Sequence, residues 1–196
     1  MIRFRDMVTY EKTFSLSQLS LAVKTGYECM HVNAARMSLS IGLVNFLGSF
    51  VSSDARPFVT ALGNICVNTV LETAQNIANT GGKMKLPLSS TPLLLAAYFL
   101  RDGAYGYTMG HLTHPKPEES LVLRVAKSVG AGFVVGVITS PAQVAIKDLL
   151  YKGCCKEVVT TFCNEPKSLI PAGLARGFHV AAVISTLTVL RELSSK

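Results

Sequence analysis

One long run without a charged residue constrains this chain more than any other feature. Residues 128–146 form a stretch of 19 residues between Lys127 and Lys147 that contains no acid or base. A helix of that length rises about 28 Å, which matches a hydrocarbon core of roughly 30 Å. The sequence therefore predicts a membrane-crossing helix at this position.

Two glycines and a proline shape this run. Gly132 and Gly136 stand four residues apart, a spacing that lets a neighbouring helix approach closely. Pro141 lies near the end of the run and has no backbone N–H to donate, so we expect a kink there. The prediction is a kinked helix that packs tightly along its glycine edge.

A regular set of motifs follows the kinked run. Tyr151 and Gly153 form an aromatic-x-Gly motif, Glu165 comes 12 residues after that glycine, and Gly173 comes eight residues after Glu165. A second apolar run then extends to Leu190. Residues 121–196 are thus the part of the chain in which several spaced signals agree with one another.

The order and spacing of these motifs resemble one repeat of the mitochondrial carrier family. Each repeat of that family holds two transmembrane helices joined by a short helix on the matrix side. The resemblance implies an all-α fold, an integral membrane helical bundle with short matrix-side helices. It also implies a multi-pass protein of the mitochondrial inner membrane.

The charged signature of the family, Pro-x-Asp/Glu-x-x-Lys/Arg, is only partly present. In the last repeat Pro141 is kept, but Gln143 replaces the acid and Ile146 replaces the base. The same three positions of the preceding repeat hold Val70, Glu72 and Gln75. In carriers these acids and bases form a ring of ion pairs that closes the matrix side, and an uncharged pair cannot act as a latch. The resemblance therefore implies that gating by this ring cannot operate here.

The start of the chain aligns with the middle of a carrier repeat. Asn33 takes the place of Gly173. Three residues after it, Arg36 takes the place of Arg176, which likewise comes three residues after Gly173. We divide the single carrier-like domain, residues 1–196, into a partial first repeat at 1–54, a second repeat at 55–120 and a third at 121–196. Because the partial repeat lacks its first span, we expect about five transmembrane helices rather than six.

The other expected elements follow from apolar runs and turn residues. We expect spans at residues 37–53, 57–77 and 91–111, a surface helix at 15–24 and a glycine-rich turn at 79–85. The basic residues, Lys147 among them, are expected mostly in segments that connect the helices.

Two adjacent charges interrupt the expected span at 91–111. Arg101 and Asp102 would each cost roughly 2.5 to 3.5 kcal/mol inside a membrane unless they face protein, water or each other. At this point of the fourth carrier helix such a pair resembles the substrate contacts of amino-acid carriers. The alternative is that both residues lie near a helix end and bind interfacial water, lipid or a partner subunit.

Composition limits the class of protein and its ligands. The chain is 49% hydrophobic and 16% charged, which favours a membrane protein over a soluble helical bundle, the alternative that composition leaves open. The net charge is +7, and no aromatic residues are interleaved with the basic ones. This pattern indicates binding to phospholipid, for example cardiolipin, rather than to nucleic acid. The five cysteines show no CxxC pair, and neither they nor the histidines predict a metal site or another cofactor.

Two functions remain after this reading, and neither is enzymatic. No Ser-His-Asp, Cys-His or nucleotide-binding motif is present. The degenerate gate and the missing span favour a non-transporting accessory subunit of a mitochondrial inner-membrane complex, most of all cytochrome c oxidase or a respiratory supercomplex, with other membrane subunits as partners. The alternative is a divergent carrier of a small anion or amino acid, with Arg36, Arg101, Asp102 and Arg176 as its contact residues. This alternative predicts that these side chains meet at one water-filled pocket, whereas the structural hypothesis predicts no continuous central cavity.

Overall fold

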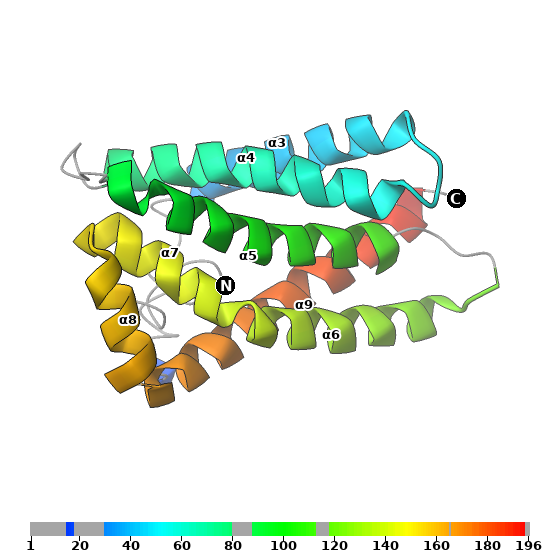
Figure 1. Ribbon diagram of the computed structural model, residues 1–196. Helices are drawn as coiled ribbons and strands as arrows, with labels where there is room; N and C mark the ends of the chain where they lie inside the picture. Colours follow the sequence, from blue (N-terminus) through cyan, green and yellow to red (C-terminus); the bar gives the residue numbers. More distant parts are fainter. Residues whose placement is uncertain (1–14, 18–29, 80–87, 113–117, 165, 195–196) are drawn as a thin grey trace.

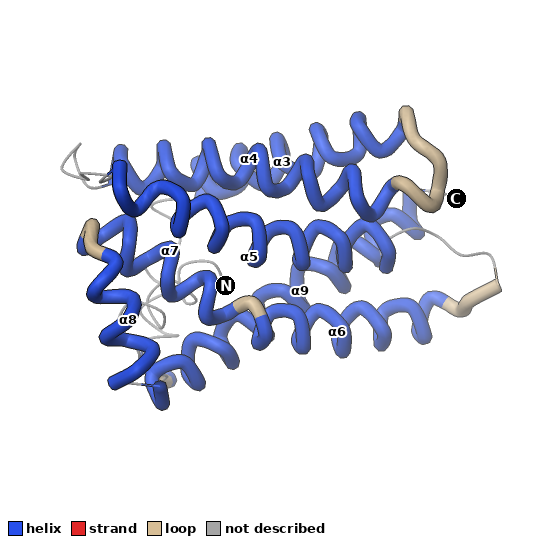
Figure 2. Tube along the Cα trace, viewed as in Figure 1, coloured by secondary structure: helices blue, strands red, loops and turns tan. Residues whose placement is uncertain are grey.

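The computed structural model describes residues 15–17, 30–79, 88–112, 118–164 and 166–194 (Figure 1). All regular structure within these ranges is helical, which confirms the all-α part of the predicted fold class (Figure 2). The long helices are α3 (Met30–Ser49), α4 (Arg56–Asn79), α5 (Thr91–Leu112), α6 (Leu121–Ile138) and α9 (Leu169–Ser194). The shorter ones are α7 (Ser140–Lys152), α8 (Cys155–Asn164) and the 3₁₀ turns η1 (Leu88–Ser90) and η2 (Pro166–Ser168).

Helices are present where spans were predicted at residues 37–53, 57–77 and 91–111. α4 and α5 match the predicted spans at 57–77 and 91–111 to within two residues, whereas α3 begins seven residues before the predicted start at residue 37. Of the expected surface helix only residues 15–17 are described, and 18–24 lie outside the described residues, as does the glycine-rich turn from residue 80 onward.

The uncharged run is two helices and not one, which corrects the predicted span at 128–146. α6 ends at Ile138, Thr139 adopts a turn conformation, and α7 begins at Ser140 with Pro141 in its first turn. A proline is tolerated in the first turn because the N–H that it lacks has no intrahelical acceptor there. The predicted kink is thus confirmed, but it falls in the middle of the run (Figure 2).

α6 packs along α9, as its glycine edge predicts. A Cβ atom added at Gly136 would lie 2.6 Å from the Cα atom of Gly177, and one added at Gly132 would lie 2.9 Å from the Cα atom of Ala181. The two backbones can approach this closely only because no side chain separates them.

Polar contacts continue this α6–α9 interface toward the chain's C-terminal end. Ser128 and Thr188 share a buried hydrogen bond of 2.8 Å between their hydroxyl groups. One helical turn further along α6, the guanidinium of Arg124 forms an ion pair with Glu192. Four turns of α6 are therefore matched to α9 by small or polar residues.

The other helices complete a bundle around a small apolar core at the kinked end. α5 packs on α4, because Gly106 and Gly110 leave room for the backbone and side chains around Thr60. α7 contributes a continuous buried stretch that packs on α5 and α8, and α8 lies across the end of the bundle (Figure 1). This core consists of Leu94, Ala97, Tyr98, Ala142, Ala145, Ile146, Leu149, Leu150 and Val158.

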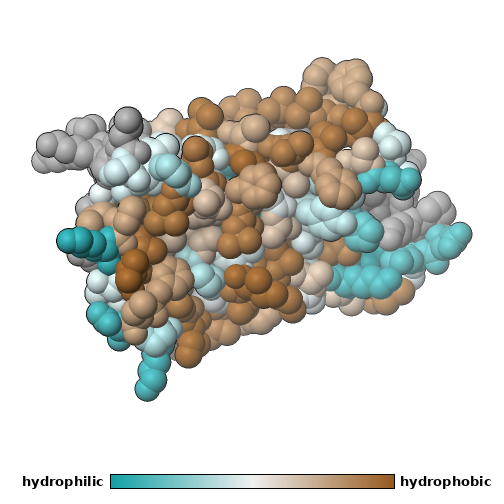
Figure 3. Space-filling view, in the orientation of Figure 1, coloured by the Kyte–Doolittle hydropathy of each residue, from teal (hydrophilic) through white to brown (hydrophobic). Residues whose placement is uncertain are grey.

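The exterior of the bundle is largely apolar. Large hydrophobic side chains are exposed on every long helix, for example Phe46, Phe58, Phe99, Val122 and Ile170. In the view of Figure 3 they form a broad apolar zone, with hydrophilic residues gathered toward the two ends. Within the described ranges, α6 and α9 are the two helices long and apolar enough to cross a membrane.

Candidate functional site

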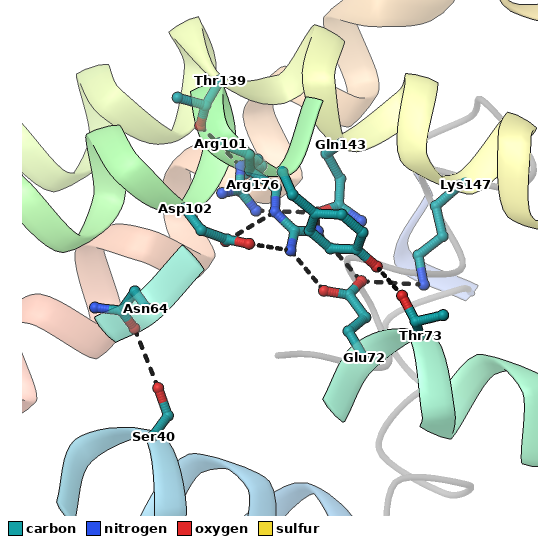
Figure 4. A network of polar contacts seen from close by, with 11 residues as sticks. Ser40, Asn64, Glu72, Thr73, Arg101, Asp102, Thr139, Gln143, Lys147 and Arg176 are labelled. Carbon is teal, nitrogen blue, oxygen red and sulfur yellow. Dashed lines mark hydrogen bonds and ion pairs between the residues drawn. The ribbon is translucent and has the colours of Figure 1, made fainter. Parts of the chain in front are cut away.

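A buried charge network lies where α4, α5, α7 and α9 meet, and Arg101 is its centre (Figure 4). Arg101 lies in the middle of α5 and is 2% exposed. Its guanidinium donates to both oxygens of Asp102 at 2.9 and 2.6 Å and to both oxygens of Glu72 at 3.2 and 2.6 Å. A fifth bond, of 2.8 Å, runs to the side-chain oxygen of Gln143. All five N–H donors of Arg101 are therefore satisfied.

Gln143 joins Arg101 to a second arginine. Its side-chain oxygen also accepts a hydrogen bond of 3.2 Å from Arg176 on α9, and Arg176 donates a further bond of 2.9 Å to the hydroxyl of Thr139. Gln143 and Thr139 are buried, so these contacts are shielded from solvent. The amide nitrogen of Gln143 has no hydrogen-bond partner in the described part of the chain. Two arginines from different helices are thus held on one uncharged oxygen.

Lys147 and Tyr98 extend the network on the other side of Arg101. The ammonium of Lys147 lies 3.7 Å from Glu72, and both side chains are less than a tenth exposed. The guanidinium carbon of Arg101 lies 4.8 Å from the centre of the Tyr98 ring, whose hydroxyl contacts Thr73 at 3.3 Å. The network therefore ties residues from four helices together at one level of the bundle.

A cavity begins beside this network and extends toward the opposite end of the bundle. The centre of a water molecule can move through about 70 Å³ of it, enough for on the order of five waters or a small solute. Its polar and charged lining comes from Ser40, Asn64, Asn68, Glu72, Arg101, Asp102, Tyr105, Arg176 and His179. Ser40 also donates to the side chain of Asn64 at 3.1 Å, which connects α3 to α4 along the cavity wall.

The structure brings together three of the four residues named as substrate contacts. Arg101, Asp102 and Arg176 all line this one cavity, as the transport hypothesis predicts. The alternative placement of Arg101 and Asp102 near a helix end is wrong, because both are buried in the middle of α5. Arg36 lies on α3, but its side chain is outside the described residues.

The positions of the degenerate gate separate into three groups. Glu72 and Gln143 belong to the network. Val70 is 66% exposed and points away from it, and Ile146 is fully buried in the apolar core, so neither can take the place of a gate residue. Pro141 lies in the first turn of α7, and the side chain of Gln75 is outside the described residues.

The three residues of the repeat motif have separate outcomes. Gly153 ends α7 with a positive φ of 68°, a conformation that glycine adopts without strain. A Cβ atom added at Gly173 would lie 3.3 Å from the hydroxyl of Ser140, so this glycine allows α9 to pack closely on the start of α7. Glu165 lies outside the described residues.

Sequence reasoning missed Lys147 and Thr139. We expected Lys147 in a connecting segment, but it is buried within α7 and faces Glu72. Thr139, Gln143 and Lys147 are spaced four residues apart, which places them on one face of a helix. This polar stripe in an otherwise apolar run was the signal that could have identified both residues. The carrier motif instead directs the search for a base to Ile146.

The arrangement can hold an ion or cross-link helices. No cluster of three or more metal-binding side chains occurs within the described ranges. Comparison of the chain with protein-family profiles, with curated proteins and with solved structures finds no significant match.

Proposed function

We propose that this chain is a non-transporting, carrier-like structural subunit of a mitochondrial inner-membrane complex. The observation that carries the proposal is the complete internal pairing of Arg101, whose five donors are all taken by Asp102, Glu72 and Gln143. A transporter that used Arg101 to bind substrate would have to separate these contacts in each cycle, and breaking a buried pair costs about 3 to 5 kcal/mol. A fixed membrane component keeps them closed.

The distribution of polarity supports a position in the membrane. Charged side chains of α4 and α5 face one another inside the bundle, while apolar side chains cover the outside. This is the arrangement expected for helices surrounded by lipid, because an unpaired charge facing hydrocarbon is costly. We propose that α3, α4 and α5 cross the membrane together with α9 and the α6–α7 pair, which gives five spans.

The packing of α3 supports a partner subunit. Within the described residues, α3 packs mainly against α4, and its packing against α9 is much smaller, with Ile41 on the cluster of Met109 and Leu187. The cavity is lined from both of these helices, by Ser40 on one side and His179 on the other. Polar walls within a membrane require a protein neighbour or water. We propose that another membrane subunit covers this side.

The cellular assignment rests on the motif resemblance alone. A carrier-like subunit belongs to the inner mitochondrial membrane, and we prefer cytochrome c oxidase or a respiratory supercomplex as the host assembly. A bound phospholipid such as cardiolipin is compatible with the net charge of +7.

Site-specific photocross-linking in native mitochondrial membranes tests the structural proposal. A photoreactive amino acid at Ser38 lies on the side between α3 and α9. Ser38 is exposed and lies about 60° around α3 from Ile41, which packs on the cluster of Met109 and Leu187. The matched control position is Phe99, which is 63% exposed on the outer face of α5. We expect adducts to one other membrane subunit at Ser38 and predominantly lipid adducts at Phe99. Lipid adducts alone at both positions would contradict the proposal.

Transport of a small anion or amino acid remains a second candidate, because Arg101, Asp102 and Arg176 share one cavity. The structural hypothesis predicts no continuous central cavity, and the cavity beside Arg101 counts against that part of it. Exchange of labelled amino acids or carboxylates in proteoliposomes tests this candidate, with Arg176→Gln as the variant that must abolish exchange. A rate equal to that of protein-free vesicles would exclude it for the substrates tested.

A further inference from the structure

Two features of the bundle surface lie at opposite ends of the bundle. The first is an aromatic cluster, defined as Phe58, Tyr107 and His111. The rings of Phe58 and Tyr107 meet edge to face at 5.4 Å, and those of Tyr107 and His111 stack at 6.4 Å. All three residues are exposed, at 62% for Phe58 and 44% for Tyr107.

The aromatic cluster occupies one end of the bundle and is followed by polar residues. Phe58 is in the first turn of α4, and Tyr107 and His111 are in the last two turns of α5. Phe46 and Phe50, a second exposed pair with centroids 4.9 Å apart, lie at the same end, where α3 leads into α4. Among these residues Tyr107 and His111 have a polar tip, and such aromatic side chains favour the boundary between hydrocarbon and headgroups. Three helices thus present aromatic residues at one level.

The second feature is α8, which lies across the opposite end. Its Val158 faces the core, while Val159, 60% exposed, and Lys156 face outward. Because its apolar face is buried against the core and its outer face is mostly polar with one lysine, α8 can lie along the headgroups without entering the hydrocarbon. The sulfur of Cys155 contacts the hydroxyl of Ser90 at 3.1 Å, which places the start of α8 level with the start of α5.

The separation of the two features can be measured along α5. Ser90 and Tyr107 are 17 residues apart, which corresponds to about 26 Å at 1.5 Å per residue. A hydrocarbon core is roughly 30 Å thick. We infer that the aromatic cluster and α8 lie at the two headgroup levels of a phospholipid bilayer, with the Arg101 network at hydrocarbon depth between them. This inference rests on the proposed membrane position of the chain.

The chain contains no tryptophan, so single tryptophans can report depth without background. Three variants are made at exposed positions: Tyr107→Trp in the aromatic cluster, Val159→Trp on α8, and Phe99→Trp between them. Phe99 is eight residues from Tyr107 and nine from Ser90, which places it near the bilayer centre. Each protein is reconstituted into phosphatidylcholine vesicles brominated either next to the headgroup or near the end of the acyl chain.

We expect the shallow bromines to quench Tyr107→Trp and Val159→Trp most strongly, and the deep bromines to quench Phe99→Trp most strongly. The depth difference between Phe99→Trp and Tyr107→Trp should be about 12 Å, from eight residues at 1.5 Å each. Deep quenching of all three variants would overturn the assigned levels while leaving the membrane position intact. Absence of quenching at Phe99→Trp by either lipid would overturn the membrane position itself, and the proposed function with it. Circular dichroism of each variant confirms that the helical fold is retained.

Discussion

Replacement of Arg101 by methionine tests the charge network most sharply, because it removes the one group that Glu72 and Asp102 share. The change keeps much of the side-chain length but leaves two buried carboxylates without their common partner. At an effective dielectric constant of about 20, each pair with charges about 4 Å apart contributes about 4 kcal/mol of attraction, offset in part by desolvation. We therefore expect Arg101→Met to lower the free energy of unfolding by about 3 to 5 kcal/mol, the range for a broken buried pair.

The measurement is reversible unfolding in mixed micelles at increasing denaturing detergent, followed by circular dichroism. The control is Lys127→Met, which removes the ion pair between Lys127 and Glu119. The side chain of Lys127 is 48% exposed, so this change should lower the free energy of unfolding by at most about 1 kcal/mol. A double variant, Arg101→Met with Asp102→Asn, removes one of the two uncompensated carboxylates and leaves Glu72 beside Lys147, so it should recover part of the loss. If the free energy of unfolding of Arg101→Met is within about 1 kcal/mol of that of the original protein, the network does not hold the bundle together.

Two further predictions concern the α6–α9 interface. Gly136→Ala should destabilise the bundle by about 1 to 3 kcal/mol, because the added Cβ atom meets Gly177 at 2.6 Å. Gly130→Ala is the matched control: a Cβ atom there has no neighbour within 4 Å, so the helix should be unchanged or up to about 1 kcal/mol more stable. Equal effects of the two changes in the same unfolding assay would refute the close-packing account. Ser128→Ala should lower the free energy of unfolding by about 0.5 to 1.5 kcal/mol, because it removes the hydrogen bond to Thr188. The double variant with Thr188→Val should cost little more than the costlier of the two single changes, because both remove the same bond.

The fold could be predicted to the level of helices because apolar runs and turn residues are local signals. α4 and α5 were located within two residues, and the glycine spacing in α6 correctly indicated a close neighbour. The prediction of one helix across the uncharged run was wrong, because a proline inside an apolar stretch does not reveal whether it bends one helix or starts another. That choice depends on packing, here the burial of α7 against α5 and α8.

The site could be predicted only in part because it joins residues from four helices. Arg101 and Asp102 were found as charges in an apolar segment, and Glu72 as the surviving acid of a motif. Their mutual pairing could not be inferred, since it depends on the rotation of α4 relative to α5. Lys147 was missed because the carrier motif places its base at position 146, whereas the spacing of four residues from Gln143 was the more informative pattern.

The central claim is that this chain works as a fixed part of a larger membrane assembly, and the mass of the particle that contains it tests this directly. Mitochondrial membranes are extracted in a mild detergent, and the chain is followed by mass spectrometry across native size fractions. The account predicts that the chain migrates with the subunits of one respiratory complex and is depleted at the size of its own 21.0 kDa in a detergent micelle. A stable, monodisperse monomer that carries most of the chain would contradict it.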